Sequence, residues 1–175
     1  MKVIVAENHE EVSRLAADIL EETVRTNPCC TLGLATGSSP VGMYRELSRR
    51  CREEGLDFSR IHSVNLDEYV GLAPTHEQSY RYFMNKNLFD HVNIDKNKTY
   101  VPNGLEEDSD KACADYNEII RSVGGIDIQL LGIGGNGHIG FNEPGEAFEK
   151  ETHCVDLTES TIKANARFFE SMDEV

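Results

Sequence analysis

The sequence predicts an α/β fold, a three-layer α/β/α sandwich with a mostly parallel, Rossmann-like sheet. Short β-rich apolar runs alternate along the chain with amphipathic helical patterns, an order typical of parallel strands joined by right-handed crossovers. The 175 residues, 39% of them hydrophobic, fit a single domain over residues 1–175 that is long enough to bury a core. A glycine-rich turn follows the last long apolar run. It would lie at the carboxyl end of a strand, which is where open α/β sheets bind small molecules.

The first ninety residues contain three expected strands and three expected helices, recognised by apolar periodicity. The strands are expected at residues 2–5, 31–34 and 61–66, and the helices at residues 10–24, from 40 through 47, and 79–89. Pro40 suits the first turn of the second helix, because its fixed backbone angle and missing N–H cost nothing there.

The second half of the chain continues the alternation. We expect a helix over 108–123, a strand over 126–133, a further strand over 153–157 and a final helix over 159–169, with a surface loop at 102–110. Parallel strands bring their carboxyl ends to one edge of a sheet. Polar side chains that directly follow the strands should therefore converge on one site.

The first such group follows the second expected strand and contains three hydroxyl side chains. Thr36, Gly37, Ser38 and Ser39 precede Pro40 at the start of a helix, where free N–H groups and the helix dipole favour an anion. The run lacks the Lys of a nucleotide P-loop, which favours a terminal sugar phosphate over ATP. An ordinary N-capped helix remains the alternative.

Two adjacent acids follow the third expected strand. Asp67 and Glu68 should point to opposite sides, so at most one enters a pocket directly unless the strand has already ended. Asp67 is the candidate base, because a carboxylate at the mouth of a strand can remove a proton next to a carbonyl if burial raises its pKa. A solvated loop with a helix-capping acid is the alternative.

The glycine-rich turn presents Asn136, His138 and Glu143. A histidine can carry a proton to and from a sugar ring oxygen, while a neighbouring amide or carboxylate fixes its tautomer. The alternative is a histidine satisfied by backbone hydrogen bonds within the turn. The other five histidines are scattered without ligand spacing, so no metal site is expected.

Composition limits the partners of the chain. Thirty-one acidic residues against seventeen basic ones give a formal charge of −14, which disfavours nucleic acid and anionic membranes. The first residues have neither a signal-peptide nor a transmembrane pattern, so a cytoplasmic location is expected. The five cysteines lack CxxC spacing and are expected to be reduced thiols.

Three runs together closely resemble the glucosamine-6-phosphate deaminase family. They are residues 65–72 (NLDEYVGL), 35–40 (ATGSSP) and 132–144 (GIGGNGHIGFNEP). The match extends through residues 79–80 (SY), 89–92 (FDHV) and 163–169 (KANARFF), so it covers essentially the whole chain.

This resemblance implies an enzyme of amino-sugar catabolism that needs no cofactor. It would convert glucosamine 6-phosphate and water into fructose 6-phosphate and ammonia, an aldose–ketose isomerisation coupled to deamination. His138 would open the sugar ring, assisted by Glu143 and Asn136, and Asp67 would move a proton from C2 to C1. Some family members have aspartate where this chain has Asn136, so the relay here would be neutral.

The resemblance also assigns the substrate contacts and the extent of the chain. Thr36, Gly37, Ser38 and Ser39 would cradle the phosphate, with Arg167 as its charged clamp. Family members continue well past residue 169 and include a lysine that joins the phosphate site, so a chain truncated at its C-terminus is expected. The expected partner is a small sugar phosphate, and assembly into a homo-oligomer is left open.

Two rival functions remain at this point. A 6-phosphogluconolactonase-like hydrolase shares the fold and a similar glycine–histidine turn, but lactone hydrolysis does not need the base and relay that isomerisation requires. A non-catalytic sugar-phosphate sensor would need the phosphate loop without Asp67, His138 and Glu143. The presence of all three favours the deaminase.

Overall fold

Short parallel strands form the sheet at the centre of the computed structural model, which describes residues 1–145 and 149–165. The strands are β1 (Thr31–Leu34), β2 (His62–Asn65), β3 (Thr99–Tyr100) and β4 (Ile128–Gln129), in the order β3-β2-β1-β4. Every strand pair is parallel, with β1 against both β2 and β4 and β2 against β3. The α/β class with a parallel sheet is therefore confirmed.

Helices precede, connect and follow these strands. They are α1 (His9–Thr26), α2 (Val41–Glu54), α3 (Tyr80–Met84) with the π-helix η1 (Asn85–Phe89), the 3-10 helix η2 (Lys96–Lys98), α4 (Ser109–Ser122) and α5 (Glu159–Asn165). Side chains cap two of the long helices: Asn8 accepts a hydrogen bond from the N–H of Glu11 at 2.9 Å, and Asp108 accepts one from the N–H of Lys111 at 3.0 Å.

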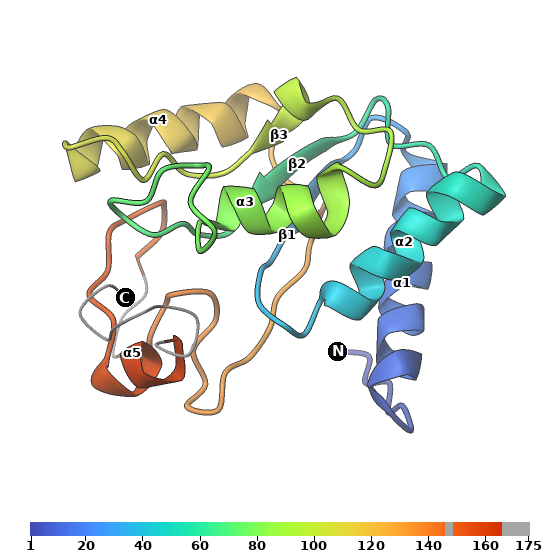
Figure 1. The fold of residues 1–175 in the computed structure, drawn as a ribbon, viewed down its shortest axis with the longest axis horizontal. Coiled ribbons are helices and arrows are strands. Elements are labelled where there is room, and N and C mark those ends of the chain that lie inside the picture. Colours follow the sequence, from blue (N-terminus) through green and yellow to red (C-terminus); the bar gives the residue numbers. More distant parts are fainter. Residues whose placement is uncertain (146–148, 166–175) are drawn as a thin grey trace.

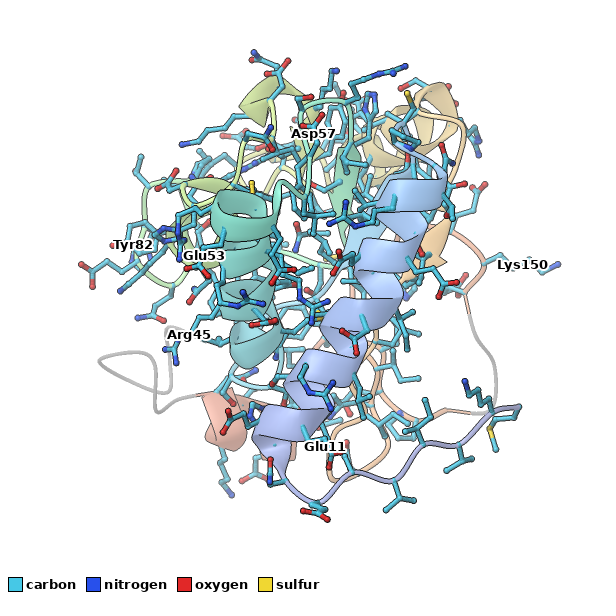
Figure 2. All side chains as sticks on the ribbon, turned by 90° about the vertical axis from the view of Figure 1, so that its right-hand side faces the viewer. Glu11, Arg45, Glu53, Asp57, Tyr82 and Lys150 are labelled. Carbon is cyan, nitrogen blue, oxygen red and sulfur yellow. The ribbon has the colours of Figure 1, made fainter. Side chains whose placement is uncertain are left out.

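The apolar core lies on the side of the sheet that α1 and α2 cover. Ala17 and Leu20 of α1 and Tyr44 and Leu47 of α2 are buried in one cluster with Leu32 of β1. Met84 and the π-helix η1 join the same cluster. Figure 2 shows α1 and α2 side by side, with Arg45 and Glu53 on the outer surface of α2.

The helix α4 covers the opposite side of the sheet (Figure 1). It is attached through Tyr116, whose single hydroxyl hydrogen is shared between the carbonyl of Asn65 at 2.7 Å and that of Tyr100 at 3.2 Å. Tyr116 is buried on this helix, and most of its other described residues remain partly or fully exposed. The sheet thus has a layer of helices on each side, with the tighter packing against α1 and α2.

Three strand predictions need correction. Residues 2–5 form no strand: Val3 and Val5 are exposed, and the segment does not pair with a described strand. The run 126–133 pairs only at Ile128 and Gln129, and 153–157 is irregular. An apolar run becomes a strand only where a neighbour satisfies its backbone N–H and C=O groups.

Other elements differ by a few residues or were missed. The helix expected at 79–89 is α-helical only over Tyr80–Met84 and continues as π-helix over Asn85–Phe89, and Pro40 is the cap of α2 rather than its first residue. The two-residue strand β3 and the helix η2 were not predicted, because neither is long enough to show periodicity. The final helix is described from 159 to 165, and the rest of its expected range lies outside the described residues.

Two further findings concern the surface and the thiols. All five cysteines are free, and Cys30 is buried. In the described part of the chain, no helix combines the length and the apolar character that crossing a membrane requires. The single-domain organisation over residues 1–175 and the cytoplasmic location stay predictions.

Candidate functional site

Asp67 stands just beyond the carboxyl end of β2. Its carboxylate accepts a hydrogen bond from the backbone N–H of Phe141, which belongs to the glycine-rich turn. The residue as a whole is only half-buried, but its carboxyl group lies among protein atoms. Burial, followed by the negative charge of Glu68, raises the pKa of Asp67 to about 7. At neutral pH, Asp67 can therefore both accept and return a proton.

Glu68 has different surroundings from its neighbour. Its carboxylate turns toward the start of α3 and accepts hydrogen bonds from the hydroxyl of Ser79 at 2.8 Å and from the backbone N–H of Tyr80 at 2.9 Å. The alternative considered for this pair, a helix-capping acid, thus describes Glu68. Asp67 instead faces the glycine-rich turn.

The glycine-rich turn holds His138, Asn136 and Glu143 in one hydrogen-bonded row. The Nδ1 atom of His138 lies 2.6 Å from Oδ1 of Asn136, whose Nδ2 donates to Oε2 of Glu143 at 2.8 Å. The backbone N–H of His138 also donates to Oδ1 of Asn136, at 3.1 Å. The three residues that the sequence selected from this turn are thus in contact with one another.

This row fixes the tautomer of His138. The amide nitrogen of Asn136 faces the Glu143 carboxylate, which can only accept, so the amide oxygen must face His138. That oxygen accepts a proton from Nδ1, which leaves Nε2 of the neutral ring as an acceptor. The network therefore presents a proton-accepting nitrogen at the far side of the imidazole.

Two threonines hold the other end of the row, and sequence reasoning missed both. Oε1 of Glu143 accepts hydrogen bonds from the hydroxyl of Thr158 at 2.9 Å and from that of Thr161. Burial raises the pKa of Glu143, but the hydrogen bonds from Thr161, Thr158 and Asn136 outweigh it and lower the pKa overall. Both threonines lie at the start of α5, where hydroxyl residues commonly act as caps, and that was the available signal.

Two glycines allow the close approaches within the site. A Cβ atom on Gly134 would lie 2.2 Å from the imidazole of His138. Gly140 has a positive φ of 60°, and a Cβ there would lie 2.6 Å from Leu66 and 3.0 Å from Oδ2 of Asp67. These contacts place the turn directly against the end of β2.

The expected phosphate loop follows β1 and leads into α2. Thr36 and Gly37 are half-buried, and Ser38 and Ser39 are exposed. The carbonyl of Ser39 lies 3.0 Å from Nε2 of His9, which ties the loop to the start of α1. Arg167, the expected charged clamp, lies outside the described residues.

An aromatic cluster, which sequence reasoning also missed, joins the three parts of the site. It consists of Tyr69, Tyr80 and Phe141, whose ring centroids lie between 4.9 and 5.6 Å apart. The Tyr80 hydroxyl hydrogen-bonds with Thr36 of the phosphate loop. The cluster thus connects the phosphate loop, the segment of Asp67 and the glycine-rich turn, although its members are distant in sequence.

A cavity of about 760 Å³ adjoins this site on the side of α4. Its lining includes Asp67, Tyr69 and Phe141 from the site, Tyr116 from α4 and Gln129 from β4. The loop at 36–39 and His138 are not part of its lining. The hydrogen-bonded groups described above, rather than this cavity, define the candidate active site.

Comparison with known proteins gives one family match. A family model described as "Glucosamine-6-phosphate isomerases/6-phosphogluconolactonase" matches residues 6–168. Glucosamine-6-phosphate deaminase of Clostridium perfringens (strain 13 / Type A) is 61% identical over 175 residues, which are 100% of this chain and 72% of the relative. The enzyme of the same name from Lachnoclostridium phytofermentans is 58% identical, over 100% of this chain and 74% of the relative.

Solved structures agree with this match. A monomeric glucosamine-6-phosphate deaminase superposes with a TM-score of 0.96 at 47% identity, covering 100% of this chain and 73% of that one. A 6-phosphogluconolactonase from Thermotoga maritima has a TM-score of 0.65 at 23% identity over 79% of this chain and 62% of its own, and this likeness concerns the fold alone.

Proposed function

The chain belongs to the family of glucosamine-6-phosphate isomerases and 6-phosphogluconolactonases, and within it we propose the deaminase activity of its most similar relatives. The enzyme converts glucosamine 6-phosphate and water into fructose 6-phosphate and ammonia. The observation that carries this proposal is the contact between the base and the relay: the N–H of Phe141 binds Asp67, and the same turn holds His138, Asn136 and Glu143.

Ring opening is assigned to His138. Its Nε2 atom takes the proton of the anomeric hydroxyl and returns it to the ring oxygen, while Nδ1 stays bound to Asn136. Positive charge that develops on the imidazole is compensated through Asn136 by the ionised Glu143. The neutral amide transmits hydrogen bonding without adding a second negative charge.

Isomerisation is assigned to Asp67. Its carboxylate removes the proton from C2 of the open-chain aminosugar and delivers it to C1. One proton of the amino group passes to the C1 oxygen in the same conversion, which leaves an imine at C2. Water adds to this carbon and ammonia departs, giving the ketose. The pKa of about 7 matches this task, because a base that must also return the proton works best near the ambient pH.

Substrate binding is assigned to Thr36, Gly37, Ser38 and Ser39, with Arg167 as the cation that pairs with the phosphate. The position of the loop between β1 and α2 supports this assignment, as does its link to the base through Tyr80. A sugar phosphate is thus the expected partner. Assembly into a homo-oligomer is left open, and a relative of known structure is described as monomeric.

The direct test is product formation by the purified 175-residue chain. Fructose 6-phosphate and ammonia are measured together from glucosamine 6-phosphate, beside a thermal-shift assay that reports folding and ligand binding. Equal appearance of the two products is expected. Hydrolysis of 6-phosphogluconolactone instead would assign the chain to the other activity of the family, and binding without turnover in a folded chain would indicate a sensor.

A further inference from the structure

The Glu68 carboxylate is completely occupied by hydrogen bonds, three from the beginning of α3 and one from the next residue in the chain. Oε1 accepts the backbone N–H groups of Tyr69 and Tyr80, both at 2.9 Å. Oε2 accepts the hydroxyl of Ser79 at 2.8 Å and the N–H of Arg81 at 3.1 Å. A carboxylate has about four lone-pair sites, so these four donors leave no acceptor capacity for a substrate.

These bonds tie the segment of Asp67 to a rigid part of the molecule. Ser79 is fully buried, and the helix that it starts runs into the core through Met84 and Leu88. Glu68 directly follows Asp67 in the chain. Anchoring its side chain therefore limits the movement of the peptide that carries the base.

We propose that Glu68 is a positioning residue for the reaction: it locks the loop of Asp67 onto α3 and keeps a fixed negative charge beside the base. This inference rests on the proposed function, since it takes Asp67 as the base that moves the proton. Glu68 itself touches no reacting atom.

The groups around Asp67 and Glu68 indicate how the negative charge of Glu68 affects the pKa of Asp67. Besides Glu68, the titratable groups among residues 1–145 and 149–165 that interact with Asp67 are the phenols of Tyr69, Tyr80 and Tyr116, which are neutral near pH 7. Arg81 interacts with Glu68, and its N–H is one of the four donors. Burial is the larger cause of the raised pKa of Asp67, and Glu68 is the second.

The charge can be removed with little change of shape by Glu68→Gln. We follow the titration of the Asp67 carboxyl carbon by ¹³C NMR, assigning its signal as the one that Asp67→Asn removes. The midpoint should fall from about 7 by about one unit, because one like charge is lost while burial stays. Glu77→Gln is the matched control: it removes an exposed negative charge from the same connection, and the midpoint should stay in place.

A second variant separates position from charge. Glu68→Asp keeps the charge but is one methylene too short to reach all four donors, so the midpoint should stay near the wild-type value while kcat falls about tenfold. In Glu68→Gln, kcat should also fall, and the acid limb of the kcat/KM profile should move to lower pH. A residue that only supported the fold would not move this limb.

Two results would contradict the proposed positioning role of Glu68. An unmoved Asp67 midpoint in a folded Glu68→Gln protein, or a wild-type kcat in Glu68→Asp, would overturn the proposal. Should Glu68→Gln fail to fold by thermal shift, the Asp variant decides through kcat and the midpoint alone. The NMR titration needs no turnover, so failure of the proposed function, with Asp67→Asn fully active, is recognised separately.

Discussion

Asp67 combines a benefit for chemistry with a cost for stability. The pKa of the Asp67 carboxyl group is about 7 in the folded chain and near its ordinary, lower value in the unfolded chain. The folded state therefore keeps this proton up to a higher pH than the unfolded state does. As the pH rises between these two values, the unfolded state loses the proton first and the free energy of unfolding falls. The loss is complete above the folded pKa and amounts to at most about 4 kcal/mol.

Asp67→Asn should therefore abolish turnover and at the same time stabilise the protein above pH 7. The amide cannot ionise, so the cost of a buried charge disappears, and phosphate-dependent binding should remain largely intact. Thermal melts of wild type and variant at pH 8 and pH 4 test this: the gain in Tm should be several degrees at pH 8 and much smaller at pH 4. An equal gain at both pH values would contradict the raised pKa, and full activity would remove Asp67 from the mechanism.

Gly134→Ala should reduce turnover by two orders of magnitude while leaving the fold intact. The new Cβ would overlap the His138 ring at 2.2 Å, so the imidazole must leave its place beside Asn136. Gly135→Ala is the matched control, because a Cβ there meets no atom within 4 Å. Steady-state kinetics and thermal melts of both variants make the comparison. Equal activity in the two would show that the position of His138 does not limit the reaction.

At the scale of single residues, the sequence identifies the groups with acid–base chemistry better than it identifies the residues that hold these groups in place by hydrogen bonds. Asp67 and His138 stand out because polar residues directly follow apolar or glycine-rich runs. Thr161 and Tyr80 reach the site from other elements, and only tertiary packing brings them there. A sequence pattern describes local neighbours, so contacts across 18 residues or more leave no periodic signal.

At the scale of elements, the helices and the two central strands were predicted well, and the edges of the sheet were not. The strand at 31–34 agrees with β1, since all four residues are buried and its neighbours on both sides supply hydrogen bonds. The run at 126–133 is equally apolar, but Leu131 and Ile133 are exposed and only two of its residues pair. Apolar composition predicts the tendency to pair, whereas the neighbouring strand determines how far pairing extends.

Arg50 should contribute strongly to the attachment of α1 to α2. Its side chain is 6% exposed and forms ion pairs with Asp18 and Glu21 of α1 and with Glu46 of α2. Arg50→Ala removes the partner that these three carboxylates share, although each keeps one other arginine (Arg14, Arg25 or Arg49). The loss of the buried side chain and its ion pairs should lower the free energy of unfolding by about 2 kcal/mol. The kcat and KM of the folded Arg50→Ala variant should be unchanged, because Arg50 and its three ion pairs lie away from the candidate active site.

The neighbouring Arg49 supplies the control for this variant. It also pairs with Glu46, and with Glu53 and Glu54, but its side chain is 38% exposed. Solvent and salt weaken such surface pairs, so Arg49→Ala should change stability little. Urea unfolding of both variants measures the difference. Similar losses would mean that burial of Arg50 adds nothing to its ion pairs.

At the scale of the whole molecule, the charge of −14 opposes the approach of an anionic sugar phosphate. Under the proposed assignment, binding depends on local groups, namely the hydroxyls and N–H groups of the loop at 36–39 and the cation of Arg167. These act at short range, whereas the repulsion of the whole chain acts at long range and is screened by salt. The Debye length shortens from about 30 Å at 0.01 M ionic strength to about 8 Å at 0.15 M.

Raising the KCl concentration over that range should therefore increase kcat/KM for glucosamine 6-phosphate, by about twofold. Screening removes the long-range repulsion first, while the contacts within the site are partly protected from solvent. Sulfate at the same ionic strength is the control: it resembles a phosphate, so it should compete for the loop and raise KM. A steep fall of kcat/KM in KCl would instead mean that local cations attract the substrate over a longer range than the acidic surface repels it.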